Sequence, residues 1–244
     1  MISDIYRWHI DVQEKRNEKE SYYIHCLINF WSMKLNEKYK TILDIPSGHG
    51  RLHKYLRLYG YDIYGVDISK ELIEIAKNNY KGYEDHYFIG DMRDFKLNKK
   101  VDVILNWFTS FGYFNDEDNI KTLNNFYENL RDNGLLILEF DNFYIQEFNR
   151  EFILNYKEVL EIDKVVQDED PKFLFFDEKF YKKQGEDLIF IGKEKIKVRK
   201  YYVEDFINLL SGKFEILSIY KTLSFNDFER NRDGRFTIVA KKLS

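Results

Sequence analysis

Two short β-branched runs, "TILDI" at 41–45 and "DIYGVDI" at 62–68, flank the amphipathic segment "RLHKYLRLYG" at 51–60. A strand, a helix and a strand in this order form a βαβ unit, whose crossover places the two strands parallel in one sheet. The alternation continues, with helices expected over 69–80 and 115–131 and strands at 86–92, 101–108 and 135–141. The pattern therefore predicts an α/β fold with a doubly wound parallel sheet.

The pattern changes after Asp141. A helix is expected over 142–154, and three segments between 158 and 200 then alternate apolar and charged residues with a period of two, which indicates an antiparallel meander. A helix over 203–212 and strands at 213–221 and 235–242 follow. We therefore expect a core made of residues 1–142 and 200–244, in which 1–39 is an N-terminal helical part, and an inserted β-rich element at 143–199.

Charge and cysteine content narrow the class of protein. Lys and Arg total 38 against 42 Asp and Glu, a net charge of −4, so no global positive field draws the chain to nucleic acid or to an anionic membrane. The single cysteine, Cys26, excludes an intramolecular disulfide and a cysteine-based zinc site, and no metal is expected. Because no leader or long apolar span is visible, we expect a cytoplasmic protein that does not enter a membrane.

A glycine turn follows the first predicted strand. The sequence "IPSGHG" places Gly48 and Gly50 where the strand turns into its helix, and in an open α/β sheet ligands bind at this edge. Glycine permits a positive φ and removes the Cβ that would keep a ligand away from the backbone. The turn therefore indicates a binding site at the carboxyl ends of the strands.

Acidic residues end the next strands as well. Asp67 ends the second strand, close to the spacing at which a carboxylate binds ribose hydroxyls, and Asp91 ends the third and is followed by Met92. These residues suit the sugar and the base of a nucleoside. A dinucleotide needs a third glycine where this chain has His53, and no phosphate-binding P-loop motif occurs. A nucleoside without phosphates is therefore favoured.

Five motifs in order, "TILDIPSGHGRL", "IYGVDIS", "FIGDMRDF", "VDVILNWFTSFGYF" and "LRDNGLLILE", resemble those of the class I S-adenosylmethionine-dependent methyltransferases. The resemblance covers about residues 40–140 and returns in the final strands. It implies a Rossmann-like seven-stranded sheet with an antiparallel last strand, and S-adenosyl-L-methionine as the cofactor. Pro46 departs from the glycine or alanine usual at that place, and proline has no N–H to donate.

The resemblance also implies roles for single residues. The glycine turn and Asp44 would face the methionine part of the cofactor, Asp67 the ribose, Asp91 and Met92 the adenine, and Asn106 the strand edge beside the sulfonium. The expected cofactor-binding residues are Asp44, Ser47, Gly48, Gly50, Arg51, Asp67, Ile68, Asp91, Met92, Asn106 and Trp107.

The acceptor is expected to enter after the fourth strand, where "NWFTSFGYF" offers aromatic faces to a cationic sulfonium. The residues expected to bind it are Phe111, Tyr113, Asp141 and Tyr144. No residue stands out as a catalytic base. The chain lacks the Asn/Asp-Pro-Pro-aromatic signature of methyltransferases that act on nucleobase amino groups or protein glutamine, and Cys26 precedes the core strands, where a cytosine-C5 nucleophile would not lie. A small-molecule acceptor, methylated on an amine nitrogen, is therefore favoured.

Two alternatives remain open. The chain could methylate RNA or protein through the basic segment "KEKIKVRK" at 193–200, or it could be a catalytically silent binding module with this fold.

The insertion has its own prediction. One apolar and aromatic face is expected on it, made of Phe173, Phe175, Phe180, Ile189 and Ile191. Such a face must be buried, either as a cover over the acceptor pocket or in a dimer interface, so the protein is expected to be a monomer or a homodimer.

Overall fold

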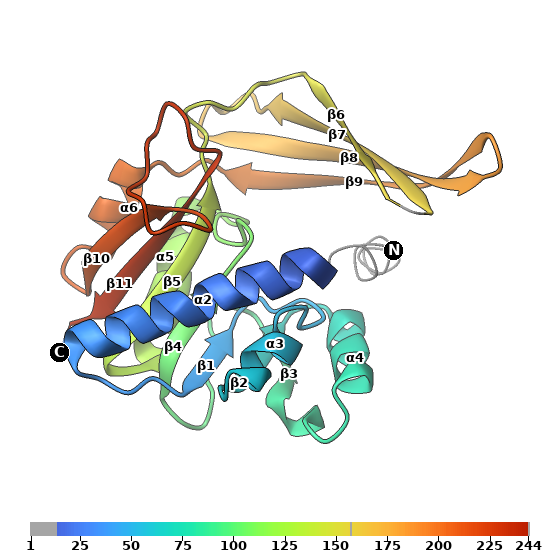
Figure 1. The fold of residues 1–244 in the computed structure, drawn as a ribbon. Helices are drawn as coiled ribbons and strands as arrows, with labels where there is room; N and C mark the ends of the chain where they lie inside the picture. Colours follow the sequence, from blue (N-terminus) through green and yellow to red (C-terminus); the bar gives the residue numbers. More distant parts are fainter. Residues whose placement is uncertain (1–13, 157, 244) are drawn as a thin grey trace.

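The described part of the protein contains two β-sheets with helices packed on the larger one (Figure 1). The structure is a computed structural model that describes residues 14–156 and 158–243. The first thirteen residues of the expected N-terminal helical part lie outside the described residues. A seven-stranded sheet forms the body, and a four-stranded antiparallel sheet projects from one end of it.

The main sheet has the strand order β10-β11-β5-β4-β1-β2-β3. Its strands pair in parallel, except that β11 runs antiparallel to both of its neighbours. This confirms the predicted Rossmann-like sheet with an antiparallel last strand. The strands are β1 (Thr41–Asp44), β2 (Asp62–Asp67), β3 (Tyr87–Ile89), β4 (Val101–Asn106), β5 (Leu130–Asp141), β10 (Phe214–Lys221) and β11 (Arg235–Lys242).

Helices connect these strands, and two of them begin at side chains that cap them. Ser69 accepts a hydrogen bond from the N–H of Leu72, and Asn115 accepts one from Asp118, so each satisfies a donor at a helix start. The helix expected over 115–131 ends earlier, at Asn129, and Arg131 lies in β5. The helices are α2 (Glu14–Leu35), α3 (His53–Leu58), α4 (Lys70–Asn79), α5 (Asp116–Asn129), α6 (Val203–Leu210) and the short 3₁₀ helix η1 (Glu84–His86).

The core lies on both faces of the main sheet, because successive side chains of a strand point to opposite sides. Ile42 of β1 packs on one side with Ile24 of α2 and Leu56 of α3. Leu43, the next residue, packs on the other side with Phe126 of α5 and Phe206 of α6. Both faces are therefore covered by helices, and the carboxyl ends of the parallel strands are left for a ligand.

The projecting sheet is the predicted antiparallel meander, with one more strand than expected. Its strands are β6 (Glu151–Asn155), β7 (Val159–Gln167), β8 (Phe173–Gln184) and β9 (Asp187–Arg199). The helix expected over 142–154 is wrong, because residues 142–150 form a loop and β6 begins at Glu151. The backbone of β6 pairs with β7, and its side chains are all exposed, so no buried apolar contact holds this segment as a helix.

The expected aromatic face of this sheet is also wrong. Phe173 and Phe175 pair with Arg199 and Lys197, whereas Phe180 is an odd number of residues away and faces the opposite side. On the outer side, the Lys195 ammonium lies 3.9 Å from the centre of the Phe175 ring.

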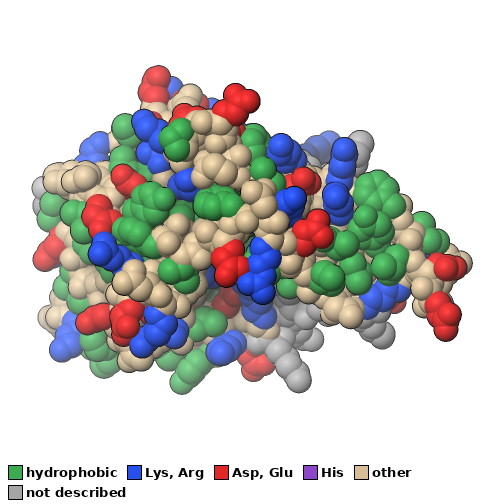
Figure 2. All heavy atoms as spheres, turned by 90° about the horizontal axis from the view of Figure 1, so that it is seen from above, with side chains coloured by type: hydrophobic (Ala, Val, Ile, Leu, Met, Phe, Trp, Pro, Cys, Tyr) green, Lys and Arg blue, Asp and Glu red, His purple; other side chains and the backbone are tan. Residues whose placement is uncertain are grey.

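The inner face of the projecting sheet packs on the main core through Val165, Leu174 and Val198. Further along the strands, apolar residues are exposed, and Figure 2 shows hydrophobic side chains gathered over the projecting end. They include Phe152, Ile153, Leu154, Leu188, Ile189, Phe190 and Ile191. Among the residues that the structure describes, no helix is long and apolar enough to cross a membrane.

The packing of α5 gives a test of the core. Replacing Phe126, which is fully buried, by Ala should lower the free energy of unfolding by about 3–5 kcal/mol, because the aromatic ring leaves a cavity. Ile120 lies on the same helix and is 45% exposed, so Ile120→Ala should change it by less than about 1 kcal/mol. Chemical denaturation followed by circular dichroism measures both. Equal losses would contradict the placing of the core on this face of α5.

Candidate active site

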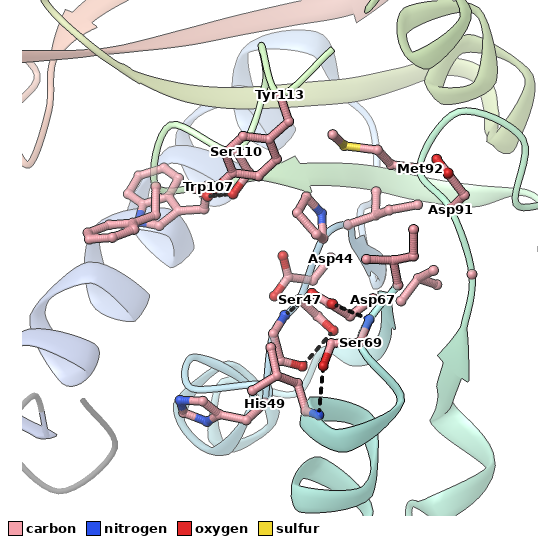
Figure 3. A pocket seen from close by; sticks show the side chains of 18 of the residues that line it. Asp44, Ser47, His49, Asp67, Ser69, Asp91, Met92, Trp107, Ser110 and Tyr113 are labelled. Carbon is pink, nitrogen blue, oxygen red and sulfur yellow. Dashed lines mark hydrogen bonds between the residues drawn. The ribbon is translucent and has the colours of Figure 1, made fainter. Parts of the chain in front are cut away.

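A cavity of about 540 Å³ lies at the carboxyl ends of β1, β2, β3 and β4 (Figure 3). Its volume is within the range of about 300–1,000 Å³ that is common for small-molecule sites. The structure brings together here most of the residues predicted to bind the cofactor. Those that line the cavity are Asp44, Ser47, Gly48, Arg51, Asp67, Ile68, Asp91, Met92 and Trp107.

The glycine turn between β1 and α3 uses its two glycines differently. Both have positive φ, 55° at Gly48 and 73° at Gly50, which other residues adopt only with strain. Gly48 lines the cavity, and a Cβ added there would meet no atom within 4 Å. Gly50 does not line it, and its Cβ would come within 3.2 Å of the side chains of His53 and Tyr87. Gly48 therefore leaves space in the cavity, whereas Gly50 serves packing beneath it.

Asp67, at the end of β2, joins two loops of the site. Its Oδ2 accepts the N–H of Gly48 at 2.8 Å, and its Oδ1 accepts the N–H of Ser69 at 2.8 Å. The side chain is buried, and this burial raises the pKa of Asp67 although the two N–H groups act in the opposite direction. The carboxylate therefore shapes the turn as well as facing the cavity.

Asp91 and Met92 follow β3, on the side expected to hold the adenine. Both carboxylate oxygens of Asp91 accept hydrogen bonds from Arg93. Nη2 lies 2.6 Å from Oδ2, and Nε lies 3.0 Å from Oδ1. The Arg93 guanidinium holds the pKa of Asp91 below its usual value. Met92 is buried and extends toward the cavity in Figure 3. Adenine recognition by these two residues stays a prediction.

Asn106 and Trp107 end β4. Asn106 is buried below the cavity and does not line it, and its Nδ2 donates to the carbonyl of Ile45 at 2.7 Å. Trp107 lines the cavity, and its indole N–H donates to Glu20 of α2 at 2.9 Å. Burial opposes the ionisation of Glu20, but Arg51 and Arg16 outweigh it and lower the pKa of the carboxyl group. The ion pair between Glu20 of α2 and Arg51 therefore holds the carboxylate to which Trp107 of the cavity wall donates.

Phe108 and Thr109 continue the loop with positive φ, 69° and 53°, although neither is glycine. The backbone N–H of Phe108 donates to Glu139 Oε2 at 2.8 Å, and Arg235 donates to Thr109 Oγ1 at 2.8 Å. Arg235 is also paired with Glu139 at 2.5 Å. Glu139 is buried, which raises its pKa to about 7. Side chains of β5 and β11 therefore hold a strained loop at the cavity.

Comparisons with known proteins agree with this geometry. Residues 42–134 match a family model described as a methyltransferase domain. A solved S-adenosylmethionine-dependent methyltransferase from Clostridium acetobutylicum has a TM-score of 0.79 at 22% identity, over 96% of this chain and 94% of that one. Residues 42–134 therefore carry a methyltransferase domain, and the chain has the fold of this solved methyltransferase.

Two further proteins similar to the methyltransferase domain act on amino sugars according to their names. A dTDP-3-amino-3,4,6-trideoxy-alpha-D-glucopyranose N,N-dimethyltransferase of Streptomyces venezuelae is 28% identical over 101 residues, which span 41% of each chain. The aligned stretch is thus less than half the length of the curated relatives. CalS10, an amino pentose methyltransferase of Micromonospora echinaspora solved with S-adenosylmethionine bound, has a TM-score of 0.73 at 14% identity, over 98% and 95% of the two chains.

The cavity fits S-adenosylmethionine, the cofactor expected for a methyltransferase domain with this fold. The space above Gly48 admits a ligand close to the backbone, and the carboxylates of Asp44 and Asp67 face the same cavity. When bound, the cofactor supplies an electrophilic methyl group. Gly50 and Asn106 do not line the cavity, so the cofactor contacts expected from them stay predictions.

The four residues expected to bind the acceptor are placed differently by the structure. Tyr113 lines the cavity. Phe111 is fully buried against Tyr201 and Phe206, so it has a core position and does not line the cavity. Asp141 is 3.0 Å from Arg235, and neither it nor Tyr144, whose hydroxyl donates to Glu204, lines the cavity.

Several residues of the cavity wall were missed by the sequence analysis. Ser110 belongs to the loop that was singled out for its aromatic residues, of which Phe114 also lines the cavity, and His49 lies between the two glycines. Residues 194–197 of β9 close the wall from the projecting sheet. No local pattern marks the β9 residues, because they reach the cavity only through the path of the sheet.

The inner face of the projecting sheet also carries acidic residues. Carboxylate oxygens of Glu161, Asp163 and Glu178 lie within 4.8 Å of one another. Burial is the main cause that raises the pKa of Glu161 and Asp163, and it raises that of Glu178 to about 8. Glu161 and Glu178 therefore retain protons to a higher pH than exposed carboxylates do.

The two bonds of Asp67 yield a prediction. Asp67→Ala should weaken the binding of S-adenosylmethionine about 10- to 150-fold, because it removes a charged acceptor from the ribose side and frees the Gly48 turn. Asp62→Ala, at the opposite end of β2, is the control and should leave binding unchanged. Isothermal titration calorimetry measures both. An unchanged dissociation constant for Asp67→Ala would refute the ribose role.

Proposed function

We propose that this chain transfers a methyl group in line from S-adenosylmethionine to an amine nitrogen of a small molecule. The observation that carries the proposal is the wall of the cavity. Opposite the glycine turn, the cavity is bounded by Tyr113, Phe114 and residues 194–197 of β9, which makes it a recess of small-molecule size rather than an open surface. The names of the amino-sugar methyltransferases described above support nitrogen as the acceptor atom.

The residues of the site would act mainly by positioning. In-line transfer needs the acceptor nitrogen and the sulfonium methyl to be held close together, with water excluded. Trp107, Phe108 and Phe114 present aromatic rings at the cavity, where they suit the positive sulfonium. The ion pairs of Glu20 and Glu139 keep this loop fixed. An amine that enters uncharged carries its own nucleophilic electron pair.

The same proposal assigns different roles to the two sheets. Residues 1–142 and 200–244 would supply the cofactor site, and residues 143–199 would cover the acceptor. The contribution of β9 to the cavity wall supports a cover, while the exposed apolar end in Figure 2 would suit a homodimer contact. The monomeric or homodimeric state and the cytoplasmic location stay predictions.

Methylation of RNA or protein has less support. In the basic segment at 193–200, Lys195 and Lys197 lie over the rings of Phe175 and Phe173, and Lys197 also pairs with Asp168 at 2.9 Å. These lysines are thus engaged within the outer face of the projecting sheet. The arrangement favours a small acceptor.

The acceptor class can be tested with matched compounds. The protein is incubated with labelled S-adenosylmethionine and a dTDP-linked 3-amino sugar, its 3-hydroxy counterpart, a panel of small amines, transfer RNA and a peptide mixture. We expect label only on amines, detected by mass spectrometry at the nitrogen. Label on RNA, peptide or hydroxyl would overturn the proposal, and tight cofactor binding without any transfer would favour the silent module.

The proposed role of residues 143–199 as a cover over the acceptor can be tested by replacing a residue of β9 that lines the cavity. Ile196→Ala should lower kcat/KM for the acceptor about 5- to 30-fold, from the loss of about 1–2 kcal/mol of apolar contact, and should leave the cofactor dissociation constant within about twofold. Ile189→Ala, at the exposed end of the same strand, is the control and should change neither. Equal effects on cofactor and acceptor would contradict a cover that acts on the acceptor alone.

A further inference from the structure

A chain of hydrogen bonds lies directly behind the carboxylate of Asp44. His53, at the start of α3, is fully buried, and its Nε2 is 3.0 Å from Asp44 Oδ2. Its Nδ1 is 2.9 Å from the hydroxyl of Tyr87 on β3, and that hydroxyl is 3.0 Å from Nη1 of Arg57. Four residues from β1, α3 and β3 are thus joined in one line that ends at the cavity.

The chemistry of these groups indicates a direction for each hydrogen bond. Arginine can only donate, so the Tyr87 oxygen accepts from Arg57. The Tyr87 O–H is then available for Nδ1 of His53. A neutral imidazole that accepts this O–H at Nδ1 carries its proton on Nε2, where it donates to Asp44. Burial is the main cause that lowers the pKa of His53, which agrees with a neutral ring that carries its proton on Nε2.

The backbone is arranged around this imidazole. A Cβ added to Gly65 of β2 would lie 2.9 Å from His53 and 2.9 Å from Tyr87, closer than real Cβ contacts. A Cβ at Gly50 would lie 3.2 Å from the same two side chains. Two glycines on different elements therefore leave space for the ring. This gives a physical reason for Gly50, which does not reach the cavity.

Asp44 in turn depends on His53. The Asp44 side chain is buried but lines the cavity, and among the described residues His53 is its only side-chain hydrogen-bond partner. We propose that His53 is a positioning residue that orients the Asp44 carboxylate toward the amino-acid portion of S-adenosylmethionine. The inference rests on the cofactor of the proposed function and adds the residue that sets the geometry of that contact.

The test compares two ligands that differ only where Asp44 would act. S-adenosylhomocysteine carries the amino-acid portion, whereas 5′-methylthioadenosine has the same nucleoside and thioether without it. His53→Leu should weaken the binding of S-adenosylhomocysteine about 10- to 100-fold and that of methylthioadenosine by less than about twofold. His53→Gln, whose amide can donate toward Asp44, should recover most of the loss. Calorimetry measures each pair.

Two further variants separate positioning from folding. Tyr87→Phe keeps the ring that stacks on His53 but removes the O–H that fixes the tautomer, so it should weaken S-adenosylhomocysteine alone, by a smaller factor. His86→Leu is the control, because His86 also pairs with an aspartate, Asp62 at 3.0 Å, but at the other end of β2. It should change neither affinity. In the wild type, ¹⁵N NMR should show a neutral His53 protonated at Nε2.

The outcomes are distinct. Equal weakening of both ligands in His53→Leu and Tyr87→Phe would make His53 a structural residue and overturn the proposal, as would no weakening of either. Because binding is measured, the result stands whether or not the acceptor proves to be an amine. If the wild type bound neither ligand, the cofactor assignment would fail, and both proposals would fail with it.

Discussion

The carboxylate of Asp67 accepts the N–H of Gly48 with one oxygen and the N–H of Ser69 with the other. The first bond reaches the turn after β1, and the second holds the residue that caps α4. Two neighbouring loops of the sheet are thereby fixed relative to each other without any ligand. Burying this carboxylate is costly, and the two N–H donors offset part of the cost. The cavity is thus preorganised, since its floor does not need to be assembled by the cofactor.

The loop after β4 depends on parts of the chain that are far apart in sequence. Glu20 of α2 holds the indole of Trp107, while Glu139 of β5 and Arg235 of β11 hold the backbone of Phe108 and the side chain of Thr109. Phe108 and Thr109 keep positive φ because these contacts hold their backbone in this conformation. A short loop at the centre of the sheet therefore requires a helix from the beginning of the chain and a strand from its end.

Local patterns in the sequence were sufficient to predict the main sheet and the edge of it where the cavity lies. Strand ends are visible as the last apolar residue before a turn, so Asp44, Asp67 and Asp91 could be placed at one edge. His53 also had a signal that was overlooked, since it is a polar residue on the helix face that buries Leu52 and Leu56. The opposite faces of Phe173 and Phe180 follow from the period of two and could have been predicted. The core position of Phe111, the strand β6 and the approach of β9 to the cavity depend on long-range packing, which no local pattern reports.

The acidic inner face of the projecting sheet couples folding to proton uptake. Glu161 and Glu178 are ionised at neutral pH in an unfolded chain, but burial raises their pKa values in the folded one. The folded state therefore binds more protons than the unfolded state, and its stability falls as the pH rises through the raised pKa values. The net charge of −4 counts every carboxylate as ionised. At neutral pH the folded protein is consequently less negative than this count, and any cation that entered the cluster would have to release the protons held there.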